Sequence, residues 1–430
     1  MTDGSVASGR MRGLLTGNSL TARVMRSSAL TVAGFGMSQG LRLLSNLVLT
    51  SLLFPEAIGL MALVMVFMVG LQMFSDFGIG PAVSRNARGD DPAFLDTVWT
   101  IQILRGIVLF GIGCLLAAPM AAFYNEPLLF WMLIVASFQF LLTGLMPTRR
   151  ETANRHLALG KLTLLEVIAQ IVSLVVLVGM AFWFRSVWAL VFGTLVGVLI
   201  QLVLLTLFLP GHRNRLHWDR AAASKVVHFG KWIFLSTICG FLLAQGDKLI
   251  LGKFLPLDLF GIYNIGFFLG SFPLMLGLMM ISRILIPVYR DCPPAASREN
   301  FLKLRKMRML VTIGLLSVVG LLAFIGPWLV DLIYDERYLA AGAVVVLISC
   351  MQIPLVIGLT YDQAALAAGD SRSFFAVSAT KAGFVLLGLF FGRAVRGPDR
   401  GADWAGHRDT GGISGSGLVV VPAGGLGSAA

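Results

Sequence analysis

The sequence predicts an all-α, polytopic integral membrane protein. Of its 430 residues, 57% are hydrophobic and only 13% are charged, and the mean hydropathy is +0.84. Soluble domains carry roughly 25% charged residues. Apolar runs of span length recur along the chain, and about 20 apolar residues are enough for a helix to cross a bilayer. Basic residues gather in alternate connections between these runs, as they do in membrane proteins.

We expect eleven transmembrane helices, although the internal repeat described below would give twelve. The predicted spans are 28–53, 58–83, 98–122, 128–147, 162–184, 186–209, 229–251, 262–288, 308–332, 340–361 and 374–392.

The connections set the predicted orientation. Most of the 34 Lys and Arg residues lie in the N-terminal tail, residues 1–27, and in the even-numbered connections. The odd-numbered connections hold only Arg185, Lys253 and Arg337. Cytoplasmic loops are the basic ones, so the tail is predicted to be cytoplasmic. We expect no cleavable signal peptide, because the tail lacks a short apolar core.

The first span carries an arginine, Arg42, near its middle. Gln39 and Asn46 lie three residues before and four residues after it, so all three share one helix face. A guanidinium at this depth is costly unless it faces protein or water. Two interpretations follow: an arginine tied to a neighbouring carboxylate for structure alone, or a polar stripe that lines a cavity for an anionic cargo.

An internal echo predicts two like-oriented lobes. Ser51–Leu63 and Gly252–Ile265 both contain the end of an apolar run, a proline, an acidic residue and a glycine that opens the next run. An even number of spans separates the copies, which indicates a parallel repeat with a pathway between the halves. The predicted lobes are 28–209 and 229–392, and the second lacks one helix. A cytoplasmic linker, residues 210–228, joins them, and we expect it to be solvated surface.

Residues 393–430 differ from the rest of the chain. They are rich in glycine and contain no span-length apolar run. We expect no chemistry there. A reading-frame slip, a truncated end or a flexible tail would each account for this composition, and the missing twelfth helix puts the activity of this chain in question.

Charged groups inside predicted spans are the candidates for function. The positive ones are Arg42, Arg105, Lys231, Lys248, Arg283 and Lys381, and the negative ones are Asp76, Glu166 and Asp247. Lys231 and Arg283 lie near the inner face, where anchoring by snorkelling is expected. The surplus of positive charge suits phosphate or carboxylate oxygens.

The acidic candidates allow two roles. Asp76 or Glu166 could couple transport to protons, or each could only neutralise an arginine. Asp247 and Lys248 are adjacent, so they point about 100° apart on their helix and do not both face one groove squarely; Gln245 accompanies them as a lumen candidate. We find no nucleotide-binding loop, metal signature or nucleophile elbow, and expect no cofactor and no enzymatic activity.

Several segments resemble the polysaccharide-transporter (Wzx-like) family of the multidrug/oligosaccharidyl-lipid/polysaccharide (MOP) flippase superfamily. They are Leu41–Leu63, FSDFGIGPAVSR at Phe74–Arg85, Pro147–Gln170, GDKLILGKFLPLDLFGIYNI at Gly246–Ile265 and the PVYR ending at Pro287–Arg290. The likeness covers roughly residues 25–370. It implies two six-helix lobes, a central cationic cavity with Arg42 and Arg105 as candidate ligands, and alternating access. The implied cargo is an oligosaccharide linked to undecaprenyl diphosphate.

The sequence therefore predicts a flippase of the bacterial inner membrane that serves exopolysaccharide, capsule or lipopolysaccharide O-antigen assembly. Gln39, Asn46 and Gln245 would bind sugars. The expected partners are the lipid-linked oligosaccharide, membrane lipids and the polysaccharide polymerase machinery, with no nucleic acid. A drug or cation antiporter is disfavoured by the sign of the cavity charge. A glycan polymerase or ligase is disfavoured because the outward loops are too short to build its site.

Overall fold

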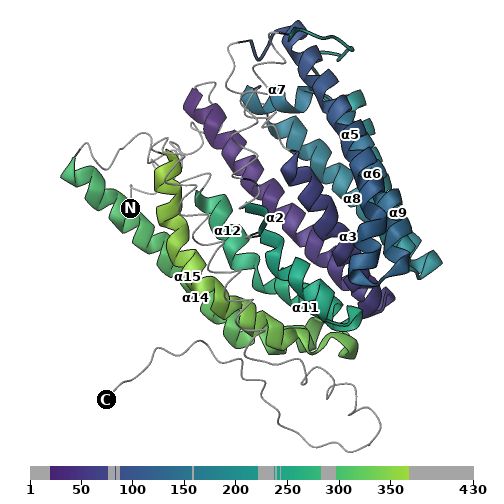
Figure 1. Ribbon diagram of the computed structural model, residues 1–430. Coiled ribbons are helices and arrows are strands. Elements are labelled where there is room, and N and C mark those ends of the chain that lie inside the picture. Colours follow the sequence, from purple (N-terminus) through teal and green to yellow (C-terminus); the bar gives the residue numbers. More distant parts are fainter. Residues whose placement is uncertain are drawn as a thin grey trace, which may run out of the picture. The chain divides into compact units, whose positions relative to one another are not determined.

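The computed structural model describes residues 20–75, 83, 88–156, 159–220, 237, 240–242, 244–281 and 297–367. Every regular element in these ranges is helical, which confirms the predicted fold class (Figure 1). The last predicted span and the glycine-rich tail lie outside these ranges. So do four charged candidates, namely Asp76, Lys231, Arg283 and Lys381.

The first part of the chain folds into long helices with short turns between them. They are α2 (Leu20–Leu52), α3 (Pro55–Phe74), α5 (Pro92–Tyr124), α6 (Pro127–Gly144), α7 (Arg149–Arg155), α8 (Leu159–Phe184) and α9 (Val187–Phe208). Helices α3, α5 and α6 each begin at a proline, which fits the first turn because no intrahelical partner is needed for its missing N–H. Asn125 ends α5 in the left-handed conformation, with a φ of 59°.

The second part holds α11 (Leu257–Gly270), α12 (Phe272–Met280), α14 (Arg298–Ile333), the short 3-10 helix η2 (Glu336–Tyr338) and α15 (Ala341–Ala367). Residues 244–254 are also largely helical. The predicted span 262–288 is divided at Ser271, since Pro273 in the first turn of α12 cannot continue the hydrogen-bond ladder of α11.

Eight helices of the described ranges are long and apolar enough to cross a membrane. Helix α2 is not one of these eight, because Gln39, Arg42 and Asn46 lower its hydropathy. The predicted count of eleven therefore stays a prediction.

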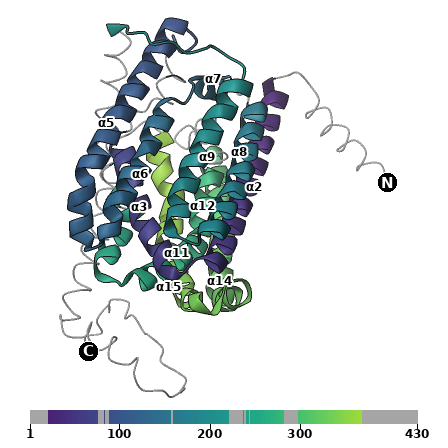
Figure 2. The same ribbon diagram turned by 90° about the vertical axis from the view of Figure 1, so that its right-hand side faces the viewer.

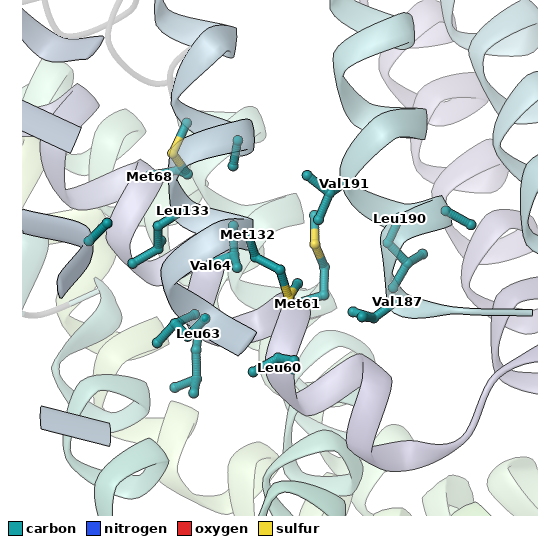
Figure 3. Close-up of a cluster of buried hydrophobic side chains, with 14 of the residues drawn as sticks. Leu60, Met61, Leu63, Val64, Met68, Met132, Leu133, Val187, Leu190 and Val191 are labelled. Carbon is teal, nitrogen blue, oxygen red and sulfur yellow. The ribbon is translucent and has the colours of Figure 1, made fainter. Parts of the chain in front are cut away.

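Helix α3 lies at the centre of the main hydrophobic core. Figure 3 shows its apolar side chains against those of α6 and α9. The residues labelled there are Leu60, Met61, Leu63, Val64 and Met68 of α3, Met132 and Leu133 of α6, and Val187, Leu190 and Val191 of α9. Around this core α5 packs on α6, and α8 packs on both α2 and α9 (Figure 2).

The two glycines of the sequence echo meet where α3 and α11 begin. A methyl group on Gly59 would overlap the carbonyl oxygen of Leu257 and lie 3.1 Å from Gly261 N. A methyl group on Gly261 would overlap the carbonyl oxygen of Pro55 and lie 3.0 Å from Gly59 N. Reciprocal contacts of this kind are what a two-fold relation between repeats produces.

Further bonds close the same end of the molecule. The Tyr338 hydroxyl, buried at the end of η2, donates to Leu53 O over 3.0 Å. Arg337 lies over the Phe54 ring, 5.1 Å from its centroid. The turn between α2 and α3 is therefore fastened to the segment between α14 and α15.

At the other end, the described part of the linker docks on α5 and α7. The Asp96 carboxylate of α5 is buried and accepts hydrogen bonds from His212 Nε2 at 2.8 Å and from Arg215 N at 3.0 Å. Asp219 N donates to Thr97 Oγ1 at 3.1 Å. Arg213, Leu216, His217 and Trp218 are exposed, so this segment is surface, and side chains of α5 hold it in place by binding its backbone and ring atoms.

Candidate substrate cavity

A cavity of about 500 Å³, the central cavity, lies between the N-terminal helices α2, α3, α8 and α9 and the C-terminal elements 244–254 and α11. Its polar lining residues are Arg42, Ser45, Asn46, Thr194, Gln245, Lys248 and Asn264. The remaining lining is apolar, with Leu49, Ile58, Met61 and Phe268 among it. The volume falls within the roughly 300–1,000 Å³ that is common for ligand sites.

The charged side chains that line the central cavity are both cationic. They are Arg42 and Lys248, and none of the described residues that line this cavity is acidic. In the described ranges Arg42 makes no hydrogen bond or ion pair and is exposed. It lies ten residues before the end of α2, a rise of about 15 Å. The ammonium group of Lys248 lies over the Phe267 ring, 4.2 Å from its centroid.

Asp247 does not line the central cavity. Its carboxylate instead accepts a hydrogen bond from the Tyr263 hydroxyl of α11. Asp247 and Lys248 therefore face different directions, as expected for adjacent residues on a helix. Of the two, only Lys248 contributes its charge to the central cavity.

A second cavity, the N-terminal chamber, adjoins the first and has a volume of about 540 Å³. Arg42, Ser45, Met65, Leu177 and Thr194 line both cavities. The polar residues that line only the chamber are Ser38, Gln139, Arg150, Glu166, Gln170, Ser173 and Gln201, from α2, α6, α7, α8 and α9.

Glu166 forms an ion pair inside this chamber. Its Oε1 lies 3.2 Å from Arg150 Nη2. The same oxygen is buried and has no hydrogen-bond partner in the described ranges. Glu166 and Arg150 therefore interact as an ion pair without a hydrogen bond between them. Of the two roles considered for Glu166, proton coupling and neutralising an arginine, this position fits the second.

The structure places two other candidates away from both cavities. Arg105 Nε donates to Ser75 Oγ and Arg105 Nη2 donates to Gln72 O, each over 3.0 Å, at the end of α3. Gln39 Nε2 reaches Met275 Sδ of α12 at 3.5 Å. The structure therefore brings together Arg42, Asn46, Gln245 and Lys248, and neither Arg105 nor Gln39 lines these two cavities.

Sequence reasoning missed several cavity residues. Arg150 was counted as a basic residue of a cytoplasmic connection, although α7 turns it toward Glu166. Gln139 and Gln201 are not among the candidates named from the sequence. Each is an isolated amide in a strongly apolar helix, which is the signal that could have found them.

Comparison with models of protein families shows which family this chain belongs to. The family model described as "Polysaccharide biosynthesis protein" matches residues 48–343. The chain belongs to the polysaccharide biosynthesis protein family. This confirms the resemblance stated above, and the match includes most of the helices that build both cavities.

Curated relatives of this family member are distant. It is 23% identical over 276 residues to the teichuronic acid biosynthesis protein TuaB of Bacillus subtilis, covering 63% of this chain and 56% of TuaB. It is 23% identical over 325 residues to the lipopolysaccharide biosynthesis protein WzxC of Escherichia coli, covering 74% of this chain and 64% of WzxC. The chain thus spans less than two thirds of the length of either relative.

Solved structures identify the fold. An inward-facing multidrug resistance MATE family transporter of the MOP superfamily matches with a TM-score of 0.57 and 12% identity, over 80% of this chain and 84% of the transporter. The outward-facing conformation of such a transporter matches with a TM-score of 0.53 and 13% identity, over 85% and 86%. This member of the polysaccharide biosynthesis family is therefore a multi-pass membrane protein with the fold of MOP-superfamily transporters.

Proposed function

We propose that the protein is a flippase that moves oligosaccharides linked to undecaprenyl diphosphate across the bacterial inner membrane, for assembly of a cell-surface polysaccharide. The N-terminus would be cytoplasmic, and the cargo would pass from the cytoplasmic to the periplasmic leaflet. The family membership and the transporter fold support a transport role in polysaccharide biosynthesis.

The observation that carries the proposal is the charge of the central cavity. Arg42 and Lys248 are the charged residues among its described lining, and they come from opposite halves of the chain. The neighbouring Asp247 carboxylate is bonded to Tyr263 outside the lining. A diphosphate brings the opposite charge, and a guanidinium offers it two parallel N–H donors. Because each half supplies one cation, the bound diphosphate would link the halves while they rock, and the polyprenyl chain would stay in the bilayer.

The competing function is a drug or cation antiporter, which the MATE fold by itself allows. A cationic drug in this cavity would meet two like charges, and like charges at short range are repulsive in a medium of low dielectric constant. The lining chemistry therefore favours the lipid-linked glycan.

The experiment is complementation of a strain that lacks this protein and accumulates lipid-linked units. We expect Arg42→Ala to lower polymer output by about tenfold or more, since a hydrogen bond to a charged group contributes about 1.5–3 kcal/mol. Arg42→Lys should retain part of the activity. Arg185→Ala, which removes an exposed arginine from the turn between α8 and α9, is the matched control and should act like wild type.

The sidedness of the accumulated units distinguishes the alternatives. Inward-facing lipid-linked units in the Arg42→Ala strain support flipping. Normal polymer together with lost drug resistance would instead support the antiporter.

A further inference from the structure

The N-terminal chamber has the chemistry of a sugar-binding site. We propose that it holds the sugars of the cargo while Arg42 and Lys248 hold the diphosphate in the central cavity. This inference rests on the proposed function and assigns the two parts of one cargo to two adjoining cavities.

The first step is continuity. Arg42, Ser45 and Thr194 line both cavities, so a ligand whose anionic group lies at Arg42 can extend into the chamber without crossing a wall. Along α9 the chamber lining runs from Gly193 to Gln201, a rise of about 12 Å. Its volume of about 540 Å³ leaves room for more than one sugar ring.

The second step is the state of the lining amides. In the part of the chain that the structure describes, the side chains of Gln139 and Gln201 make no hydrogen bond. Gln170 uses Nε2 to donate to Ser38 O at 3.0 Å and keeps its Oε1 as an acceptor. An amide offers two donors and one acceptor oxygen, and so complements sugar hydroxyls, which both donate and accept.

The third step is charge balance. The chamber contains Arg150 and Glu166 as a close pair, and Glu166 Oε1 lacks an aligned donor. The pair adds no net charge, so among the described lining residues Arg42 alone gives the chamber its surplus, and that cation lies at the boundary with the central cavity. Neutral polar groups fit beyond it.

The central cavity also has amides, on Asn46, Gln245 and Asn264, but it shares that lining with the cations Arg42 and Lys248 that would hold the diphosphate. Its walls are mostly apolar, and its Asn264 amide already donates to Phe260 O at 2.7 Å. Sugar hydroxyls placed against Leu49, Ile58 and Met61 would lose water without gaining partners. The sugars are therefore better accommodated in the chamber than beside the diphosphate.

The test compares two lipids on the full-length protein in detergent. One probe is undecaprenyl diphosphate without sugar, and the other is undecaprenyl-diphosphate-linked oligosaccharide extracted from the strain that makes the polymer. Their affinities are measured for wild type, for Gln139→Leu/Gln201→Leu, and for Arg42→Met. Gln72→Leu is the matched control, since Gln72 is exposed and lines neither cavity.

We expect wild type and Gln72→Leu to bind the sugar-bearing lipid more tightly than the bare lipid. The double variant should lose that preference about tenfold or more, at roughly 1 kcal/mol for each lost hydrogen bond, while its affinity for the bare lipid stays within about twofold. That retained affinity also reports that the variant is folded. Arg42→Met should weaken the binding of both lipids.

Two results would overturn only the assignment of the sugars to the chamber. One is a double variant that keeps the preference for the sugar-bearing lipid, and the other is a wild type that binds both lipids equally. A different result overturns the proposed function, and the chamber with it: a wild type that binds neither lipid. The two failures are therefore distinguishable.

Discussion

At the scale of single residues, Arg42 and Arg105 have different surroundings in the structure. The sequence predicts both as cations inside spans and as candidate ligands of a cationic cavity. The two arginines differ in the residues that surround them in the tertiary structure. Arg105 reaches carbonyl and hydroxyl oxygens at the end of α3, whereas Arg42 faces two cavities. A helical-wheel argument places a residue on a face of its own helix, but what packs against that face depends on the tertiary structure.

The Asp247–Tyr263 bond gives a prediction at this scale. Replacing Tyr263 by Phe leaves the partly buried carboxylate without this donor, which should cost about 1–3 kcal/mol. A carboxylate released beside Lys248 should also weaken the binding of bare undecaprenyl diphosphate. The melting midpoint and the lipid affinity in detergent measure both effects.

Tyr334→Phe is the matched control for that substitution. The Tyr334 hydroxyl is buried and has no hydrogen-bond partner in the described ranges. Its removal should be neutral or slightly stabilising, because no bond is lost and a polar group leaves the interior. Equal destabilisation by both variants would show that the Asp247 bond is not what matters.

At the scale of elements, Arg149 connects α7 to the end of α9. Its guanidinium donates to Leu209 O at 2.8 Å, to Thr206 O at 3.0 Å and to His212 O at 2.8 Å. These carbonyls include acceptors that a helix end leaves without an intrahelical donor. The side chain is only 8% exposed, so water cannot easily replace it.

We therefore expect Arg149→Met to destabilise the protein by about 3 kcal/mol or more, with Arg149→Lys intermediate because one ammonium cannot reach three acceptors. Thermal unfolding in detergent measures this. Arg213→Met changes an exposed arginine of the same connection and should leave the midpoint unchanged. A midpoint for Arg149→Met equal to that of Arg213→Met would contradict the connecting role.

The loop before α5 should respond to pH. A hydrogen bond from His156, with Arg155 beside it, lowers the pKa of the Asp90 carboxyl below its usual value. The stabilisation is then present above the unfolded pKa of about 3.9 and is lost as the pH falls through the lower folded value. Asp90→Asn should reduce the melting midpoint at pH 6 and have a smaller effect at pH 2. An equal effect at both values would exclude the carboxylate as its cause.

Local sequence signals predicted the elements better than their connections. Prolines at positions 55, 92 and 127 mark helix starts. Pro273 could likewise have predicted the division of span 262–288. The docking of residues 212–219 on α5 had no local signal, because it depends on a carboxylate, Asp96, more than a hundred residues earlier in the chain.

At the scale of the whole molecule, the echo between the halves predicted two like-oriented bundles, but not that they touch through the echoed glycines. At Gly59 and Gly261 each α-carbon lies against the backbone of the other helix, so α3 and α11 approach too closely for any side chain. This contact lies at the end of the helix bundle where Tyr338 also donates its hydrogen bond to Leu53 O. In the proposed transport cycle this end would have to separate, because both α3 and α11 line the central cavity.

The last prediction follows from that requirement. Gly59→Val forces its side chain into Leu257 O, and overpacking of this kind costs about 1–3 kcal/mol in the closed state. A state in which α3 and α11 are apart escapes that cost, so its population should rise about five- to 150-fold. Cysteine placed at Ser45 in a background with the four native cysteines replaced should then react faster with a membrane-impermeant thiol reagent added from the periplasmic side. Gly111→Val, where a Cβ meets nothing within 4 Å, controls for the added bulk. If Gly59→Val labels no faster than Gly111→Val, the glycine crossing is a fixed structural contact, and the pathway must open elsewhere.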